Sequence, residues 1–152
     1  MVNNLQIILL TEQFVGDLKT LFQVIREQGD DRFFCPHPFS SVEAEKLSKY
    51  KGEDTYYILR YNNNIAGYGM LRGWDEGYQI PSLGLYIHPR YRAQGLGQLM
   101  INFLHIAARQ KGSHQIRLTV FKRNTIAISL YRKIGYTFVN EVNDALIGIY
   151  DL

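Results

Sequence analysis

Two arginines and two glycines lie directly before a stretch with helical periodicity, in the run Arg90-Tyr91-Arg92-Ala93-Gln94-Gly95-Leu96-Gly97. The first N–H groups of a helix have no backbone partner and carry partial positive charge. Glycine lets a ligand approach such amides closely, and arginine offers planar donors for phosphate oxygens. The run therefore predicts an anion site, with pyrophosphate as the expected group. A strand-to-helix connection whose glycines serve only tight packing would show the same spacing.

Two common phosphate loops do not explain this run. The sequence contains no GxxxxGK[ST], which argues against a P-loop nucleotide hydrolase. The dinucleotide pattern GxGxxG is missing as well, and so is the acidic residue that should follow it to bind a ribose. The predicted ligand is a phosphate-bearing molecule of another kind.

Two blocks of the sequence resemble the GCN5-related N-acetyltransferase (GNAT) family. The first, Ile87-His88-Pro89-Arg90-Tyr91-Arg92-Ala93-Gln94-Gly95-Leu96-Gly97, resembles that family's acetyl-CoA-binding motif. The second is Asn124-Thr125-Ile126-Ala127-Ile128-Ser129-Leu130-Tyr131-Arg132-Lys133-Ile134-Gly135-Tyr136, which is similar to N-x-x-A-x-x-L-Y-x-x-x-G-F. Tyr136 replaces the phenylalanine of that pattern. The resemblance covers at least residues 65 to 139.

The resemblance implies how acetyl-CoA, the cosubstrate, would bind. In the family, two neighbouring central strands separate and the pantetheine arm inserts between them; here these would be residues 82–88 and 115–121. The implied cofactor-binding residues are the backbone groups of Leu85, Tyr86 and Ile87, the amides of Arg92, Ala93, Gln94, Gly95, Leu96, Gly97 and Gln98, and Asn124. Asn124 could also serve simply as a helix cap, and the two roles are compatible.

Acetyl transfer needs a neutral amine, donors for the oxyanion and a proton for the departing thiolate. The family implies a backbone N–H near Tyr86 or Ile87 as oxyanion donor, which can contribute about 3–4 kcal/mol. Tyr131 matches the family's tyrosine that protonates the leaving sulfur. The pKa of a phenol is about 10 and that of a thiol about 8.5, so the transfer is accessible. The alternative for Tyr131 is a core aromatic residue beside Leu130.

The general base is left open by the sequence. Some protein N-terminal acetyltransferases of the family carry a glutamate where this chain has Thr119, so that mechanism does not carry over. Glu76 is our candidate, with Asp75 and His37 as alternatives; a solvated turn or loop packing would also explain them. Deprotonating a lysine-like amine at pH 7 costs about 4.6 kcal/mol, against about 1.4 kcal/mol for an α-amino group. Without a clear base, we expect a low-pKa amine acceptor.

Aromatic residues in two loops are the expected acceptor site. The predicted substrate-binding residues are Phe34, His37, Trp74 and Tyr78, accompanied by Phe33 and Phe39. Aromatic faces suit a sugar ring or another flat acceptor, although such residues also anchor loops onto a core. Cys35 has no partner that would make it a nucleophile, so we expect a free thiol.

These residues predict an N-acetyltransferase that acts on the primary amine of a small molecule, an amino sugar or an amino acid derivative, by direct attack. Two alternatives remain: a protein or peptide N-acetyltransferase, and a non-catalytic CoA-sensing domain. An intact Tyr131 argues against the second, because a binding module needs no acid. The net charge of +3 is mild and does not call for nucleic acid.

The 152 residues suffice for one domain, which we expect to span 1–152, and 46% hydrophobic residues suffice for a core. Apolar periodicity predicts the order βααβββαβαββ, an α+β mixed sheet with helices on both faces. The expected strands are 5–10, 55–61, 65–72, 82–88, 115–121, 136–141 and 145–150, and the helices follow Thr11, Ser40, Gly95 and Asn124.

Short apolar runs and one cysteine predict a cytoplasmic protein with no membrane span and no metal site. The C-terminal strands could pair between chains as a homodimer.

Overall fold

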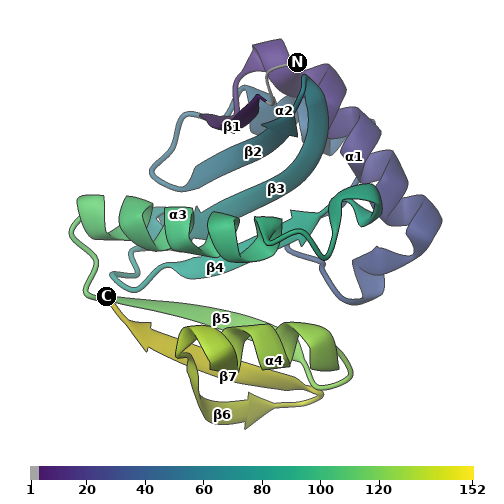
Figure 1. Ribbon diagram of the computed structural model, residues 1–152. Helices are drawn as coiled ribbons and strands as arrows, with labels where there is room; N and C mark the ends of the chain where they lie inside the picture. The colour runs from purple at the N-terminus through teal and green to yellow at the C-terminus, as the bar shows by residue number, and fades with distance from the viewer. Residues whose placement is uncertain (1–3) are drawn as a thin grey trace.

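A mixed sheet of seven strands runs through the protein, whose computed structural model describes residues 4–152 (Figure 1). The strand order in the sheet is β1-β2-β3-β4-β5-β7-β6. The strands are β1 (Leu5–Leu9), β2 (Thr55–Tyr61), β3 (Asn64–Arg72), β4 (Ser82–Ile87), β5 (Gln115–Phe121), β6 (Thr137–Val142) and β7 (Ala145–Asp151). The helices are α1 (Val15–Gln28), α2 (Ser41–Ser48), α3 (Leu96–Gln110) and α4 (Thr125–Ile134). This sequence of elements confirms the predicted fold.

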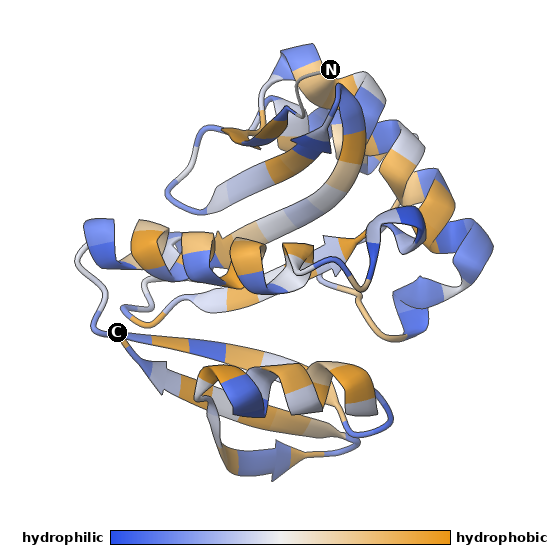
Figure 2. Cartoon of the chain, viewed as in Figure 1, coloured by the Kyte–Doolittle hydropathy of each residue, from blue (hydrophilic) through white to orange (hydrophobic). Residues whose placement is uncertain are grey.

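Each face of the sheet has its own hydrophobic core. Helices α1 and α2 pack on β2, β3 and β4 through buried residues that include Leu18, Phe22 and Tyr68. Helices α3 and α4 pack on the opposite face, where Leu104, Leu118 and other buried residues form the second core. The helices are amphipathic, with apolar residues on the side that meets the sheet (Figure 2). Helices therefore cover both faces, as expected.

Helix ends follow local sequence signals, with one exception. Ser40 accepts a hydrogen bond from the amide of Glu43 at 3.0 Å and so caps α2. Gly29 has φ 68° and ends α1, a conformation that suits glycine. Thr11, the expected cap of the first helix, makes no side-chain capping bond; a short 3-10 turn, Glu12–Phe14, follows it, and α1 begins at Val15. No helix within residues 4–152 is long and apolar enough to cross a membrane.

The parallel strands β4 and β5 separate in the middle of the sheet. They pair only at Ser82 with Arg117 in the described chain, and the amide of Arg117 also donates to the carbonyl of Pro81 at 3.0 Å. Beyond this point the two strands diverge (Figure 1). β4 pairs with β3 along its whole length, so the edge that faces β5 has no strand partner after Ser82. This separation agrees with the sequence prediction.

Alternation along the strands decides which side chains line the separated region. Ile116, Leu118 and Val120 of β5 belong to the core under α3 and α4. The residues between them therefore point to the face of α1 and α2, namely Arg117, Thr119 and Phe121. Thr119 is exposed, so this part of the sheet is open to solvent. On β4, Tyr86 faces the same side, because it belongs to the core of α1 and α2.

Candidate active site

The start of α3 presents a row of free backbone amides. Residues 93–98, here called the amide cradle, donate no hydrogen bond to any acceptor in residues 4–152. The next amide, that of Leu99, makes the first bond by donating to the carbonyl of Gly95 at 3.0 Å. Ala93 has φ 60° and Gly95 has φ 84°, which turn the chain sharply before the helix. Such free amides at a helix N-terminus form a site for a pyrophosphate.

The two glycines of the cradle differ in what limits a side chain at their positions. A Cβ atom at Gly95 would meet no atom within 4 Å, so its positive φ is the constraint there. A Cβ atom at Gly97 would lie 3.6 Å from Cδ2 of Leu130, which is ordinary contact. The same contact shows that α4 lies beside the beginning of α3. The second sequence block therefore lies next to the cradle formed by the first.

Arg92 lies at the surface and is held against the protein by two hydrogen bonds. Its Nε donates to the carbonyl of Ile87 at 2.9 Å, and its Nη2 donates to Oδ2 of Asp30 at 3.0 Å. Its guanidinium also lies over the ring of Tyr86, 5.2 Å from the centroid. The backbone amide of Arg92 faces the carbonyl of Pro89 at 3.4 Å. The side chain thus fixes the end of β4, and free amides begin at the next residue.

Asp30 completes this cluster and was not predicted. Its Oδ2 also accepts a hydrogen bond of 2.6 Å from the hydroxyl of Tyr86. Burial, together with this bond to Asp30, raises the pKa of Tyr86 above its ordinary value. No local pattern relates residue 30 to residues 86 and 92, because the contact depends on tertiary structure.

The loop after α1 crosses the separated strands. Residues 30–34, here called the strap, bind β4 through Asp30 and reach the far side through Arg123, which follows β5. Nη2 of Arg123 donates to the carbonyl of Arg32 at 2.6 Å. Its guanidinium lies over the rings of Phe33 and Phe121, with centroid distances of 5.6 and 4.5 Å. The strap therefore connects the two diverging strands at the end away from Ser82.

Tyr131 lies on α4, half-buried against the second core. Its hydroxyl makes no hydrogen bond to another group in the part of the chain that is described, so it is free for a ligand. Burial raises the pKa of Tyr131 to about 12. The phenol therefore remains protonated at physiological pH and can donate. Asn124 begins this helix, and its side-chain oxygen lies 3.4 Å from the amide of Ala127.

A buried pair beneath Tyr131 explains the departure from the family pattern at Tyr136. The hydroxyl of Tyr136 and Nε2 of His105 are hydrogen-bonded at 2.7 Å, and both side chains are buried. The ring of Tyr136 meets that of Tyr131 edge-on, with centroids 5.6 Å apart. Burial, with a smaller effect of Arg109, lowers the pKa of His105 to about 4. The neutral ring of His105 thus gives the buried hydroxyl of Tyr136 a hydrogen-bond partner, which a phenylalanine at this position would not need.

The two predicted acceptor residues of the first loop lie on the face of α1 and α2. The ring of Phe34 stacks on Tyr86 with centroids 5.9 Å apart, and its Cε1 would lie 3.4 Å from a Cβ atom at Gly84. Phe34 therefore lies on the face of β4 that packs against α1 and α2. His37 is bound within the protein: Nδ1 lies 2.7 Å from the carbonyl of Pro38, and Nε2 lies 2.9 Å from the hydroxyl of Tyr68.

The carbonyl of Pro38 can only accept, so Nδ1 of His37 carries the proton and Nε2 accepts from Tyr68. Burial lowers the pKa of His37. Its neutral ring is therefore occupied at both nitrogens. We infer that His37 shapes the loop.

The loop between β3 and β4 is fixed at the other end of α3. Oδ1 of Asp54 accepts hydrogen bonds from the amides of Gly73 and Trp74, each at 2.9 Å. Nζ of Lys111, just after α3, lies 4.2 Å from the centroid of a Trp74 ring. The span from Gly97 to Lys111 is roughly 20 Å at 1.5 Å per residue. Trp74 therefore lies far from the cradle.

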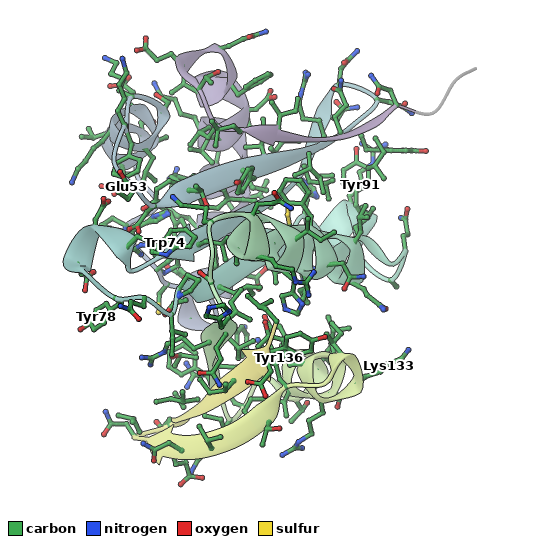
Figure 3. The ribbon with its side chains drawn as sticks, turned by 90° about the vertical axis from the view of Figure 1, so that its left-hand side faces the viewer. Glu53, Trp74, Tyr78, Tyr91, Lys133 and Tyr136 are labelled. Atoms are coloured by element: carbon green, nitrogen blue, oxygen red, sulfur yellow. The ribbon has the colours of Figure 1, made fainter. Side chains whose placement is uncertain are left out.

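Glu76 lies in the same 3-10 turn as Trp74 and is exposed. It makes no ion pair within residues 4–152. Tyr78, also exposed, lies near Trp74 and on the other side of α3 from Tyr91 (Figure 3). The structure thus places α4, which carries Tyr131, beside the cradle, and places Glu76 and Trp74 in the loop at the other end of α3.

Tyr78 lines a groove of about 420 Å³ between this loop and the open part of the sheet. The other residues of the lining include Ile80, Arg117, Asn140, Ile147 and Ile149. The groove lies where β4 and β5 meet, at the narrow end of their separation. It is therefore a candidate acceptor site beside the region where the strands open.

Comparison with known proteins agrees with this geometry. The model of the Acetyltransferase (GNAT) family matches residues 21–136. The uncharacterized N-acetyltransferase YdgE of Bacillus subtilis (strain 168) is 41% identical over 139 residues, which cover 78% of this chain and 87% of that protein. The thialysine N-epsilon-acetyltransferase of Bos taurus is 28% identical over 149 residues, covering 88% of this chain and 86% of that protein.

A solved structure shares the fold and contains the cofactor. The PaiA N-acetyltransferase from Thermoplasma acidophilum, crystallised in complex with coenzyme A, has a TM-score of 0.78 at 17% identity, over 98% of this chain and 99% of that one. The free amides at the start of α3 and the unpaired edge of β4 fit such a ligand. The chain belongs to the Acetyltransferase (GNAT) family and is an N-acetyltransferase whose cosubstrate is acetyl-CoA.

Proposed function

We propose that the protein transfers an acetyl group from acetyl-CoA to the primary amine of a small molecule by direct attack of the neutral amine. The observation that carries the proposal is the strap, residues 30–34. It joins β4 through Asp30 and the end of β5 through Arg123, on the acceptor face of the sheet. A peptide needs an open channel across this face, whereas a small amine can enter through the groove near Arg117. The protein or peptide acetyltransferase is therefore the second candidate.

Each part of the site has a defined role in this proposal. The amide cradle holds the pyrophosphate, the free edge of β4 at Leu85, Tyr86 and Ile87 holds the pantetheine arm, and Asn124 borders it. A C–N bond forms and the C–S bond breaks, with a backbone amide of β4 stabilising the oxyanion. The hydroxyl of Tyr131 donates its proton to the sulfur, the amine releases its proton to water, and water returns a proton to the Tyr131 phenolate.

The proposal assigns no side chain as general base. Glu76 is exposed and makes no hydrogen bond or ion pair through its side chain within residues 4–152, and the neutral ring of His37 is occupied by Pro38 and Tyr68. An amine with a low pKa therefore reacts more easily, because a larger fraction of it is neutral at pH 7. The relative from Bos taurus is named for acetylating an amine of thialysine, a small amino acid. That name supports a small-molecule acceptor for this chain.

A thiol-release assay with acetyl-CoA and a panel of amines tests the proposal. The panel contains amino sugars, amino acids, polyamines and short peptides, each with the same acetyl-CoA concentration. Turnover of a free small amine above that of any peptide is the expected result. Peptides acetylated faster than every small amine would overturn the acceptor class, and acetyl-CoA binding without any turnover would favour a CoA-sensing domain.

A further inference from the structure

The side chain of Arg117 has no hydrogen-bond or ion-pair partner in the described part of the chain. Its Nε is buried and makes no hydrogen bond, and its side chain forms no ion pair or hydrogen bond to any other residue from 4 to 152. Buried polar groups in proteins almost always have a partner. The backbone of Arg117 is fixed, because its amide donates to the carbonyl of Pro81 at 3.0 Å and β4 and β5 pair at this residue. The backbone is therefore fixed, while the side-chain charge has no anionic partner among residues 4–152.

The surroundings of Arg117 make its charge available to a ligand. It lines the groove described above, together with Tyr78, Ile147 and Ile149. No aspartate or glutamate belongs to that lining, all of which lies in the described part of the chain. The groove therefore combines apolar walls with one positive charge. Such a site attracts an anionic group and disfavours a molecule that carries only positive charges.

The position of Arg117 relates the groove to the reaction. Thr119 lies two residues further along β5 on the same face, about 7 Å away at the rise of a strand. From Thr119 onward the strands are apart, and the free edge of β4 faces that space. A ligand held at Arg117 by one end can extend a second group toward the place where the thioester is expected. That distance matches a small bifunctional molecule.

We propose that Arg117 binds a carboxylate of the acceptor, so that the substrates are amines that also carry a carboxylate, such as amino acids. A guanidinium binds a carboxylate through two parallel hydrogen bonds, which fixes both position and orientation. This inference rests on the proposed function. Polyamines, which lack an anion, would be poor substrates. Arg117 would act on specificity through binding and would take no part in proton transfer.

Matched acceptors test the proposal with the wild-type protein alone. Initial rates would be measured for L-lysine, L-lysinamide and cadaverine, and for thialysine, all with saturating acetyl-CoA. L-Lysine and its amide differ only at the carboxylate, and cadaverine lacks that group altogether. We expect kcat/KM for the acid to exceed that for the amide by about 100-fold. Equal values, or faster turnover of cadaverine, would overturn the inference while leaving the proposed function intact.

Variants at residue 117 test whether the guanidinium causes the preference for acceptors that carry a carboxylate. In Arg117→Gln the KM for L-lysine should rise about 100-fold with little change in kcat, while the rate with L-lysinamide and the KM for acetyl-CoA stay the same. Arg117→Lys should recover part of the preference for the acid, because lysine restores the positive charge but cannot form the two parallel hydrogen bonds of a guanidinium. The control is Arg109→Gln, which removes one positive charge at an exposed position on α3 and should leave the preference for the acid unchanged.

An unchanged preference for the acid in Arg117→Gln would overturn the role of this residue. Failure of the wild-type protein to acetylate any amine would overturn the inference together with the proposed function, so the two failures are distinguishable. Thermal unfolding of each variant, with the preference ratio measured in folded protein only, separates a specificity effect from a loss of structure.

Discussion

Ser82 and Arg117 are the paired residues at which the parallel strands β4 and β5 meet, and beyond them the strands diverge. The family's cofactor position lies in the opened region, with the amide cradle at one end and Arg117 at the other. Asp30 and Arg123 bind the strap to β4 and to the end of β5, at the wide end of the separation. One break in strand pairing therefore positions the free edge of β4, the strap and the groove proposed for the acceptor.

Asp30 should couple the strap to the cofactor motif. Asp30→Asn keeps the size of the side chain but removes the charge that holds both Tyr86 and Arg92. We expect a loss of about 1–2 kcal/mol in the free energy of unfolding and about a tenfold rise in the KM for acetyl-CoA, since the end of β4 loses its support. Chemical denaturation and initial rates measure the two effects. The control is Asp31→Asn, at the exposed neighbouring residue. An equal effect in this variant would refute the coupling between the strap and the cofactor motif.

Gly95 and Gly97 should respond differently to alanine. Gly95 has φ 84°, so Gly95→Ala should cost about 1–2 kcal/mol of stability. Gly97→Ala should leave stability nearly unchanged, because its Cβ atom would make ordinary contact with Leu130. Both variants should weaken acetyl-CoA binding measured by calorimetry, because each methyl group obstructs the approach of phosphate to the amides. Unimpaired binding by both would show that the pyrophosphate lies elsewhere.

Much of this arrangement could be predicted from local sequence, and the reasons for the exceptions are physical. The cradle and the cap at Asn124 lie within the two short blocks that resemble the family, so local sequence indicates them. Asp30 meets Tyr86 and Arg92 only after folding, and no pattern near residue 30 indicates it. The contact of His105 could not be predicted either, since its partner Tyr136 is 31 residues away in the sequence. Lys111 lies over the ring of Trp74 just after α3, a tertiary contact that no local pattern indicates.

The pair of His105 and Tyr136 should make stability depend on pH. The folded-state pKa of His105 is about 4, against an ordinary value of 6.5. Between these values the unfolded chain binds a proton that the folded protein does not, so the free energy of unfolding should fall as pH decreases from 6.5 toward 4. The double variant His105→Leu/Tyr136→Phe should show a shallower fall in urea unfolding at pH 7, 6, 5 and 4.5. An identical slope in both proteins would contradict the assigned pKa.

Glu76 offers a direct test of the absence of a carboxylate base. Because its side chain is exposed and makes no ion pair within residues 4–152, Glu76→Gln should change kcat/KM by less than about twofold. The rate should then rise with pH according to the pKa of the acceptor amine. A loss on the order of 100-fold in this variant, with the acidic limb of the pH profile removed, would instead establish Glu76 as the base.

We propose that Tyr131 donates a proton to the sulfur of acetyl-CoA held between β4 and β5. The decisive measurement compares kcat, and the dissociation constant for acetyl-CoA, in wild type and Tyr131→Phe. Because removal of a positioned general acid costs a factor on the order of 100 to 10,000, kcat should fall by that much while acetyl-CoA binds as before. With a pKa of about 12, Tyr131 should also cause no decline in rate below about pH 11. An unchanged kcat in Tyr131→Phe would contradict the account.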